Sequence, residues 1–258
     1  MNFSVIMNVL NEEQNIEYAL QSVKKLKNCD EILIADMNSK DRTVEIAQKY
    51  GAHVMQIPYD EHFDNARSIV INNAKNDWCF LLDADEMISE SLGQQIEKIV
   101  NEDKCDIVYL PTINYFFGLK SKYGLHYPCH HCRLFKKKYI NVTGKCHNYL
   151  DVVNNARELW LQGEENALIH FSFNNIEEWA KKRIRYAKLQ PRKKFKAPIF
   201  CFIKAFCRFY FKEKNIFGGY DGYILSVTEA LGEQMANLDK YYKSKNIDID
   251  SLKKSYLE

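Results

Sequence analysis

A run of acidic residues directly follows one strongly apolar stretch of the chain. Residues 78–82 are apolar enough to form a buried strand, and they lead into Asp83, Asp85 and Glu86. Carboxylates packed this closely repel one another unless a cation or a basic partner compensates them. An Asp-X-Asp sequence at a strand end suits a hard divalent ion, which takes carboxylate oxygens together with substrate phosphates. The spacing therefore indicates a divalent-cation site.

The same acidic residues also have a purely structural interpretation. Ser89 follows them and is suited to be the N-cap of an amphipathic helix over residues 89–101. Carboxylates near the start of a helix are stabilised by its positive end. This stretch alone leaves both interpretations open, and the elements around it have to decide between them.

Strand and helix patterns alternate over the first 85 residues. The sequence predicts a β-α-β-α-β-α-β series. Its strands are expected at 3–9, 31–35, 53–57 and 78–82, and its helices at 11–25, 41–50 and 64–73. Such alternation is typical of a parallel, doubly wound sheet with helices on both faces.

Polar residues stand at the ends of three of these strands. They are the segment from Asn8 to Glu12, then Asp36, and then Asp83 with Asp85. The carboxyl ends of parallel strands lie at one edge of a sheet, so these groups should line one crevice. Glycine-rich phosphate loops do not follow the first strand, which argues against a dinucleotide fold or a P-loop enzyme. Arg67 is then the first candidate for a phosphate contact.

Beyond residue 105 the pattern changes to short β-like runs, which predicts a mixed or antiparallel extension of the sheet. A strand is expected at 167–171 and a helix at 175–190, with mainly helix after that. We predict two parts, an α/β domain over 1–190 that carries this sheet and a helical extension over 191–258. The composition is that of an ordinary folded protein, with 46% hydrophobic and 27% charged residues and a net charge of +2.

The motifs resemble those of family 2 glycosyltransferases, which have the GT-A, nucleotide-sugar-binding fold. The match is dense over residues 3–90 and looser to about residue 190. Its segments are 4–13, 31–36, 39, 41–43, 65–67 and 78–86. Leu82-Asp83-Ala84-Asp85-Glu86 also resembles the bacterial branch that adds glucose to the inner core of lipopolysaccharide or lipooligosaccharide.

The resemblance implies a role for each matching position. Four residues would surround the nucleoside: Asn8, Leu10, Glu12 and Asp36. Arg67 and Lys182 would approach the diphosphate, and Asp83 would lie near the ribose or the metal. Asp85 would be the main ligand of a Mg²⁺ or Mn²⁺ ion, which neutralises the departing diphosphate, and His170 would contact the metal or the phosphates.

Two positions depart from the family pattern near the nucleoside. Met7-Asn8 replaces a turn that usually contains proline, and Met37 stands where a second Asp often follows Asp36. Neither change removes a group that the chemistry needs.

The catalytic base is a separate question. Inverting transfer needs a group that takes the proton of the acceptor hydroxyl. In the resembling branch a Gly-X-X-His-Glu element faces the acceptor, but here Asn148 stands in the place of the Glu. An amide cannot act as a base. Asp151 and His147 are the remaining candidates, and the alternative for Asp151 is an exposed loop acid.

A cysteine-histidine cluster offers an alternative metal site. Cys129, Cys132, Cys146 and His147 have a spacing that a structural zinc ion permits. Arg133-Leu134-Phe135, however, matches a strand of the glycosyltransferase pattern that needs no zinc. His170 has the alternative of a buried core histidine, and Lys182 that of a solvated basic face.

The C-terminal part combines basic and aromatic residues. From Lys181 to Lys214 every charged residue but Glu213 is basic, and Lys204, Arg208 and Lys212 recur every four residues, which places them on one helix face. The other surfaces of this helix are aromatic and apolar. This pattern is typical of binding to an anionic membrane surface, although packing on the core or on a second subunit also fits. No nucleic-acid motif accompanies the basic residues.

These observations lead to one functional hypothesis. The chain is expected to be an inverting, metal-dependent glycosyltransferase that moves a hexose, glucose, from a UDP-sugar to a hydroxyl of a lipopolysaccharide or lipooligosaccharide core. It would work as a reduced, cytoplasmic protein on the inner face of the cytoplasmic membrane, since its start shows no signal-type segment. The alternatives are another acceptor (capsule, exopolysaccharide or protein glycan) or a nucleotide-binding module with impaired catalysis.

Overall fold

The computed structural model describes residues 1–59, 64–121, 129–141, 150–153, 155–189 and 198–245. The chain divides into two compact units. The first comprises Met1–Tyr115 and His126–Ser172, and the second comprises Phe116–Leu125 and Phe173–Glu258. His147 and Asn148 lie outside the described residues.

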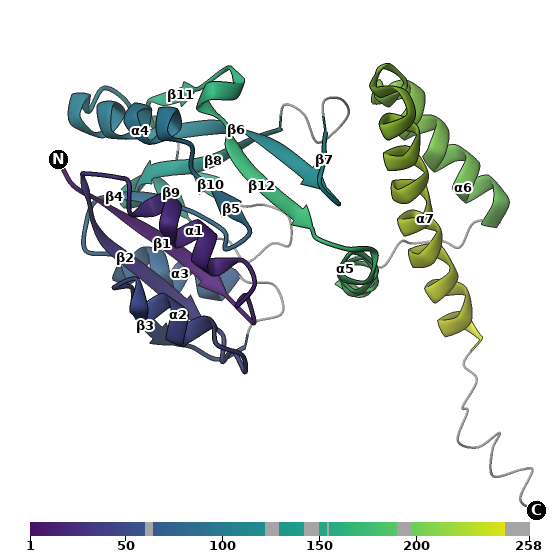
Figure 1. The fold of residues 1–258 in the computed structure, drawn as a ribbon, viewed down its shortest axis with the longest axis horizontal. Coiled ribbons are helices and arrows are strands. Elements are labelled where there is room, and N and C mark those ends of the chain that lie inside the picture. The colour runs from purple at the N-terminus through teal and green to yellow at the C-terminus, as the bar shows by residue number, and fades with distance from the viewer. Residues whose placement is uncertain (60–63, 122–128, 142–149, 154, 190–197, 246–258) are drawn as a thin grey trace, which may run out of the picture. The chain divides into compact units, whose positions relative to one another are not determined.

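The first unit is built on four parallel strands in the order β3-β2-β1-β4. β1 is buried along its whole length, as expected for a central parallel strand that helices cover on both faces. The predicted alternation is confirmed (Figure 1). The strands are β1 (Phe3–Val9), β2 (Cys29–Asp36), β3 (His53–Gln56) and β4 (Trp78–Leu81), and the helices are α1 (Ile16–Val23), α2 (Thr43–Lys49) and α3 (Asp64–Asn73).

The rest of the sheet is mixed, as predicted. β8 (Cys129–Lys136) runs antiparallel to both β4 and β6 (Ile107–Phe116), and β6 continues through Pro111 where the sequence suggested separate short runs. The full order is β3-β2-β1-β4-β8-β6-β12-β5, with β11 and β7 also paired to β6, while β9 and β10 form a separate pair. The remaining elements are β5 (Glu86–Met87), β7 (Leu119–Lys120), η1 (Lys137–Tyr139), β9 (Ile140–Asn141), β10 (Asp151–Val152), β11 (Glu158–Trp160), η2 (Glu164–Asn166) and β12 (Leu168–Phe173).

Two apolar cores cover the two faces of the sheet. Alternate residues of β1 point to opposite faces, so Val5 and Met7 enter one core and Ile6 enters the other. Apolar residues of α1 and of α4 (Glu90–Glu102) fill the first core. Apolar residues of α3 fill the second. α4 begins as predicted, because the Ser89 hydroxyl accepts a hydrogen bond from the Leu92 N–H.

The second unit is mainly helical. α5 (Ile176–Leu189) and α7 (Gly219–Ser244) share a small core that contains Trp179 and Leu225. α7 begins at Gly219, inside the glycine-rich segment 218–222. Between α5 and α7 lie α6 (Pro198–Cys207), the π-helical turn η3 (Arg208–Lys212) and η4 (Asn215–Gly218). No helix among the described residues has both the length and the apolar character needed to cross a membrane.

Candidate functional site

Two loops meet at the edge of the sheet where β1 and β2 end. Val9 and Asp36 are register partners, so these loops leave their strands side by side. The Asn11 N–H donates to Ser39 Oγ at 2.9 Å, and the Lys40 N–H donates to Asn11 Oδ1 at 2.7 Å. Asn11 has a positive φ of 56°, a conformation that Asn tolerates better than most residues. The two loops therefore form one connected rim.

Asp36 anchors this rim from inside the protein. Its side chain is fully buried, and each carboxylate oxygen accepts a hydrogen bond from Ser39. Oδ1 takes the hydroxyl at 2.5 Å, and Oδ2 takes the backbone N–H at 3.1 Å. A buried carboxylate with two donors is well satisfied. Asp36 thus holds the second loop in place, and its contact with a nucleoside stays a prediction.

Asn8 is the opposite case. It is only 8% exposed, and neither its amide oxygen nor its amide nitrogen has a hydrogen-bond partner among the described residues. A buried amide without partners is unfavourable, and such groups often serve a ligand. Leu10 packs on the α3-side core, and the Glu12 carboxylate accepts a hydrogen bond from Asn15 at 2.9 Å. Among these three residues Asn8 has the clearest unused binding capacity.

Asp83 and Glu86 share one buried arginine. Both terminal nitrogens of Arg133 lie 3.1 Å from Asp83 Oδ2, and one of them is 2.5 Å from Glu86 Oε1. Burial disfavours the charged form of Asp83, but Arg133 and Arg67 hold its pKa below the usual range. Burial raises the pKa of Glu86, and Arg133 opposes that rise. Arg67 therefore lies near Asp83 in the fold, and its predicted contact with the diphosphate stays a prediction.

A bulge in β8 directs Arg133 to this place. Val108 pairs with Leu134 but Tyr109 pairs with Cys132, so Arg133 is an extra residue in its strand. Bulges re-aim side chains and are common beside functional sites. The sequence reasoning quoted Arg133 only as part of a matching strand and assigned it no role. A lone arginine between apolar residues of a strand was the available signal, because a buried charge needs a partner.

Asp85 lies beside His170. The Asp85 Oδ2 to His170 Nε2 distance is 3.4 Å, and β5 pairs with β12 so that Glu86 stands opposite His170. His170 Nδ1 is 2.7 Å from Asn114 Oδ1, which is suited to accept the Nδ1 proton. Burial disfavours the charged imidazole, but Asp85 raises the pKa of His170 above its usual value. Asn114, which the sequence reasoning missed, orients the ring.

The Asp85–His170 pair fits a shared divalent ion. Two ligands that occupy neighbouring positions around a Mg²⁺ or Mn²⁺ ion, each about 2.1 Å from it, lie roughly 3 Å apart. Because Nδ1 faces Asn114, Nε2 is the ring nitrogen left to coordinate. No group of three metal-binding side chains is found among the described residues. An ion here would need ligands from its substrate, as nucleotide diphosphates commonly supply.

Two further predicted residues belong to other elements. Lys182 belongs to the second unit, where it is 3.4 Å from Glu178 and its ammonium stands over the Phe173 ring. Asp151 lies in β10, half-buried and opposite Asn141 of β9. The predicted diphosphate contact of Lys182 and the role of Asp151 as a base stay predictions, as does that of His147.

The positions of Cys129 and Cys132 in β8 do not support the alternative of a structural zinc site. Cys129 and Cys132 are three residues apart in an extended strand, so their side chains point to opposite faces. Cys132 is buried in the α3-side core, whereas Cys129 Sγ is 3.2 Å from His131 Nε2. These two cysteines therefore do not converge on one ion. Cys146 lies outside the described residues.

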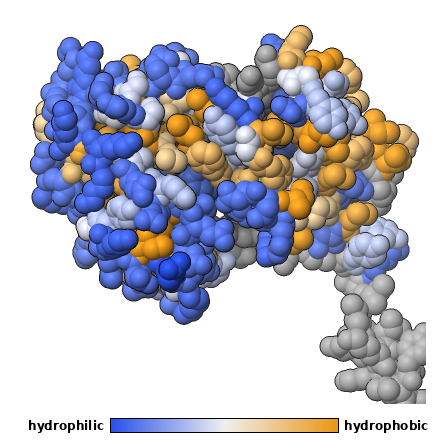
Figure 2. Space-filling view, viewed as in Figure 1, coloured by the Kyte–Doolittle hydropathy of each residue, from blue (hydrophilic) through white to orange (hydrophobic). Residues whose placement is uncertain are grey.

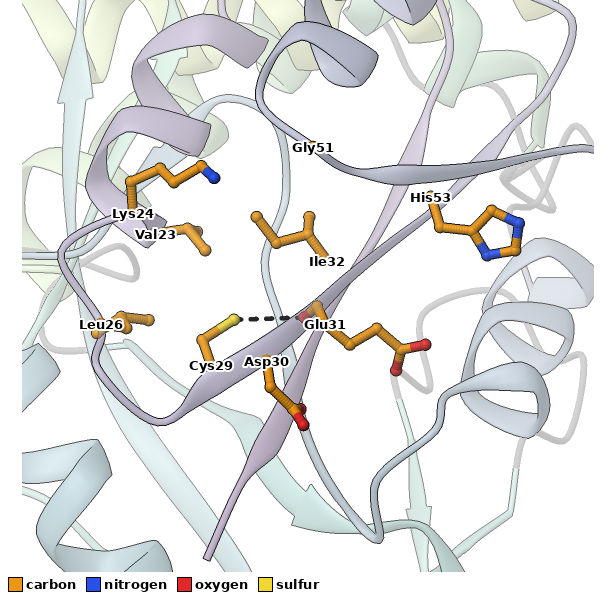
Figure 3. A pocket seen from close by; sticks show the side chains of 9 residues that line it. All are labelled: Val23, Lys24, Leu26, Cys29, Asp30, Glu31, Ile32, Gly51 and His53. Carbon is orange, nitrogen blue, oxygen red and sulfur yellow. Dashed lines mark hydrogen bonds between the residues drawn. The ribbon is translucent and has the colours of Figure 1, made fainter.

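A pocket of about 320 Å³ lies at the other end of the strands. Figure 3 shows Cys29 and Ile32 from the start of β2, with Gly51 and His53 across from them. Burial raises the pKa of the Cys29 thiol to about 11, which keeps it unreactive at neutral pH. This position at the amino end of β2 separates the pocket from the edge that carries Asn8, Asp83 and Asp85.

Comparisons with known proteins agree on the family. The Glycosyl transferase family 2 model matches residues 4–149. An uncharacterized glycosyltransferase of Rickettsia felis is 30% identical over 263 residues, covering 92% of this chain and 89% of that protein. Another, from Rickettsia bellii, is 30% identical over 240 residues, covering 84% and 78%.

Solved structures show the same architecture. The mannosyltransferase PcManGT from Pyrobaculum calidifontis has a TM-score of 0.56 at 12% identity, covering 95% of this chain and 88% of that one. S. aureus TarS 1-349 has a TM-score of 0.53 at 16% identity, covering 95% and 92%. The predicted GT-A-like fold is confirmed: a mixed α/β sheet, mostly parallel, with C-terminal helices. With the family match over 4–149, it follows that this chain belongs to glycosyl transferase family 2.

Proposed function

We propose that this glycosyltransferase moves a hexose, namely glucose, from a UDP-sugar to a hydroxyl of a bacterial glycolipid, with inversion at the anomeric carbon and with Mg²⁺ or Mn²⁺. The observation that carries the proposal is the Asp85–His170 pair at the end of β4, at 3.4 Å. It lies on the edge of the sheet where the buried amide of Asn8 has no hydrogen-bond partner within the described part of the chain.

The donor site combines the two loops with the acidic cluster. Asn8 would donate and accept hydrogen bonds with the nucleoside, and Asp36 would keep the loop around Ser39 in position. The ion would be held by Asp85 and His170, with Asp83 alongside, and when bound it would neutralise charge on the departing diphosphate. Two neighbours of similar fold support this donor class: TarS was solved with UDP, and PcManGT with GDP-Man and Mn²⁺.

The transfer step needs a base on the acceptor side. The acceptor oxygen attacks the anomeric carbon, the bond to the UDP oxygen breaks, and the hydroxyl proton passes to the base. Asp151 is the proposed base, and His147 is the alternative. Neither the departure at Asn148 nor the place of Asp151 in β10 removes the need for such a group.

The acceptor proposed here is a lipopolysaccharide or lipooligosaccharide core, met at the inner face of the cytoplasmic membrane. It rests on the resemblance of residues 82–86 to that branch. Another acceptor, such as a capsule, an exopolysaccharide or a protein glycan, would leave the donor site unchanged. A nucleotide-binding module with impaired catalysis is favoured only by Asn148.

Asp85→Ala tests the proposal. We expect at least an approximately 100-fold loss of UDP-sugar hydrolysis or transfer, because a metal ligand is removed. The Mn²⁺-dependent thermal stabilisation by UDP should also disappear. Asp30→Ala, which removes a carboxylate at the amino-end edge near Lys75, is the matched control and should keep both signals.

Survival of both signals in Asp85→Ala would contradict the proposal. The binding-module alternative would be supported if Asp85→Ala lost UDP binding while the wild type transferred sugar to none of a panel of acceptors. Asp151→Asn with unchanged turnover would eliminate that residue as the base.

A further inference from the structure

Five aromatic side chains of the second unit form a connected, partly exposed surface. They will be called the aromatic surface and are Phe206, Tyr210, Phe211, Tyr220 and Tyr223. Tyr210 links the others, with ring centroids 5.2 Å from Phe206, 5.1 Å from Phe211 and 6.1 Å from Tyr223. Tyr220 stacks on Tyr223 at 6.2 Å. The surface thus joins α6, η3 and the start of α7.

Much of this surface is open to solvent. Tyr220 is 77% exposed, Phe211 56% and Tyr223 42%. Ala205, Phe209 and Ala230 form a small buried core within this unit, and Phe206 of the aromatic surface packs against it. Figure 2 shows apolar residues gathered on the side of this unit where α6 lies. Contiguous exposed apolar patches of this kind mark interaction sites.

Lysines in the same segment carry charge that no described residue neutralises. Lys204, Lys212 and Lys214 are exposed, and within the described residues none of them has an ion-pair partner. Arg208, which the sequence predicts to share a helix face with Lys204 and Lys212, is different because it has an ion-pair partner: its guanidinium is 2.6 Å from Glu233 of α7. Asp221 is exposed beside Tyr220, and Glu213 is half-buried, so the basic groups remain in excess.

We propose that the aromatic surface and these three lysines bind the headgroup region of an anionic membrane. Tyrosine and phenylalanine rings enter the boundary between headgroups and acyl chains, while lysines reach anionic lipid headgroups. α6 has 10 residues, far fewer than the ~20 needed to span a bilayer. A second protein copy fits less well, because lysine is depleted in protein–protein interfaces.

Membrane binding would bring the enzyme to a membrane-anchored acceptor, and only this explanation of its use rests on the proposed function. Binding itself needs neither donor nor metal. It can therefore be measured in EDTA without UDP, so that a failure of vesicle binding and a failure of sugar transfer remain distinguishable.

The test is co-sedimentation of the full chain with phosphatidylglycerol-containing vesicles and with vesicles of phosphatidylcholine alone. We expect binding to the anionic vesicles that weakens as salt is raised, and little binding to the neutral ones. Phe211→Ser with Tyr220→Ser should weaken binding by roughly 10-fold or more, because two apolar anchors are lost. The control pair is Tyr18→Ser with Tyr59→Ser, two exposed aromatics of the first unit.

The charge contribution is tested separately. Replacing Lys204, Lys212 and Lys214 together by Gln should weaken binding on the order of 100-fold, since each lysine near an anionic surface contributes substantially. Replacing Lys24, Lys25 and Lys27 by Gln removes the same net charge from exposed sites of the first unit and should change little. Thermal stabilisation by UDP with Mn²⁺ would show that every variant is folded.

Three results would overturn the proposal. The first is wild-type protein that does not bind anionic vesicles. The second is a Phe211→Ser, Tyr220→Ser variant that binds within twofold of the wild type. The third is a wild-type dimer in analytical ultracentrifugation that this variant dissociates, because a second copy would then cover the aromatic surface.

Discussion

At the scale of single residues, the polar groups of the site differ in how many hydrogen-bond partners they have within the protein. Asp36 is fully buried and accepts two hydrogen bonds from Ser39, so the cost of burying its carboxylate is offset by groups of the protein itself. The buried amide of Asn8 has no such partner among the described residues. If the Asn8 amide destabilises the fold but binds the ligand, removing it should raise stability and lower ligand affinity. One substitution can therefore separate the two effects.

Asn8→Ala should therefore weaken UDP binding without weakening the fold. An unpaired buried amide costs about 1–3 kcal/mol, which offsets the small cavity that alanine leaves. We expect the free energy of unfolding in urea to be unchanged or higher, and UDP affinity in the presence of Mn²⁺ to fall roughly 10-fold, or ~1.4 kcal/mol. Isothermal titration calorimetry would measure the affinity.

Asn76→Ala is the matched control for Asn8. The Asn76 side chain donates to Ser4 Oγ at 3.0 Å and to Asp30 Oδ1 at 2.6 Å, at the amino end of the strands. This variant should lose stability but keep its UDP affinity. A stability loss in Asn8→Ala comparable to that of Asn76→Ala would mean that the Asn8 amide is satisfied within the fold.

At the scale of elements, the bulge in β8 joins the end of β4 to the middle of the sheet. The extra residue Arg133 reaches Asp83 and Glu86, which stand just before and within β5. One guanidinium thus lowers the repulsion within an acidic cluster that also contains Asp85. The proposed metal site would need this arrangement, because three neighbouring carboxylates without a basic partner would favour protonation or separation.

Arg133→Met should destabilise the protein by about 3–5 kcal/mol, because it leaves the buried carboxylate of Glu86 and the partly exposed one of Asp83 without their cation. Arg133 is only 5% exposed in its side chain. Adding Glu86→Gln removes one of the stranded charges, so the double variant should lose less than the sum of the two single losses. Urea denaturation measures each free energy.

Arg42→Met provides the comparison on the surface. Arg42 is 3.5 Å from Glu13 with a largely exposed side chain, so its loss should change stability by at most about 1 kcal/mol. If Arg133→Met were equally mild, the acidic cluster would have to be compensated in another way.

At the scale of the whole molecule, the chain consists of two units with separate apolar cores. The residues proposed for donor and metal binding, except Lys182, belong to the first unit. The aromatic surface belongs to the second. A packing defect in the second unit should then leave nucleotide binding intact, which tests whether the two functions are separable.

Gly222→Ala creates such a defect. A Cβ on Gly222 would overlap the backbone carbonyl oxygen of Asn215, where α7 passes η4. We expect a loss of about 1–3 kcal/mol in the stability of the second unit, measured by thermal unfolding, and unchanged UDP affinity. Gly219→Ala meets no atom within 4 Å and has only the strain of its positive φ, about 1 kcal/mol. Loss of UDP binding in Gly222→Ala would instead show that the units act together.

The sequence by itself determined the parallel strands, the Ser89 cap and the edge on which Asp83 and Asp85 lie. These features follow from local patterns: apolar periodicity, capping chemistry and the common direction of strand ends. The family followed from the same stretch, because its motifs are short and contiguous. Its extent, residues 4–149, covers the region where the sequence pattern was strongest.

Only the tertiary structure decided which side chains meet. Arg133 is 50 residues from Asp83 in the chain, and one extra residue in β8 directs it there. Asn114 reaches His170 only because β6 and β12 are neighbours in the sheet. Arg208 pairs with Glu233, 25 residues away in the chain, because the tertiary structure places α7 beside it. Such pairings depend on strand register and on contacts between distant segments. The spacing of residues along one segment carries no information about either.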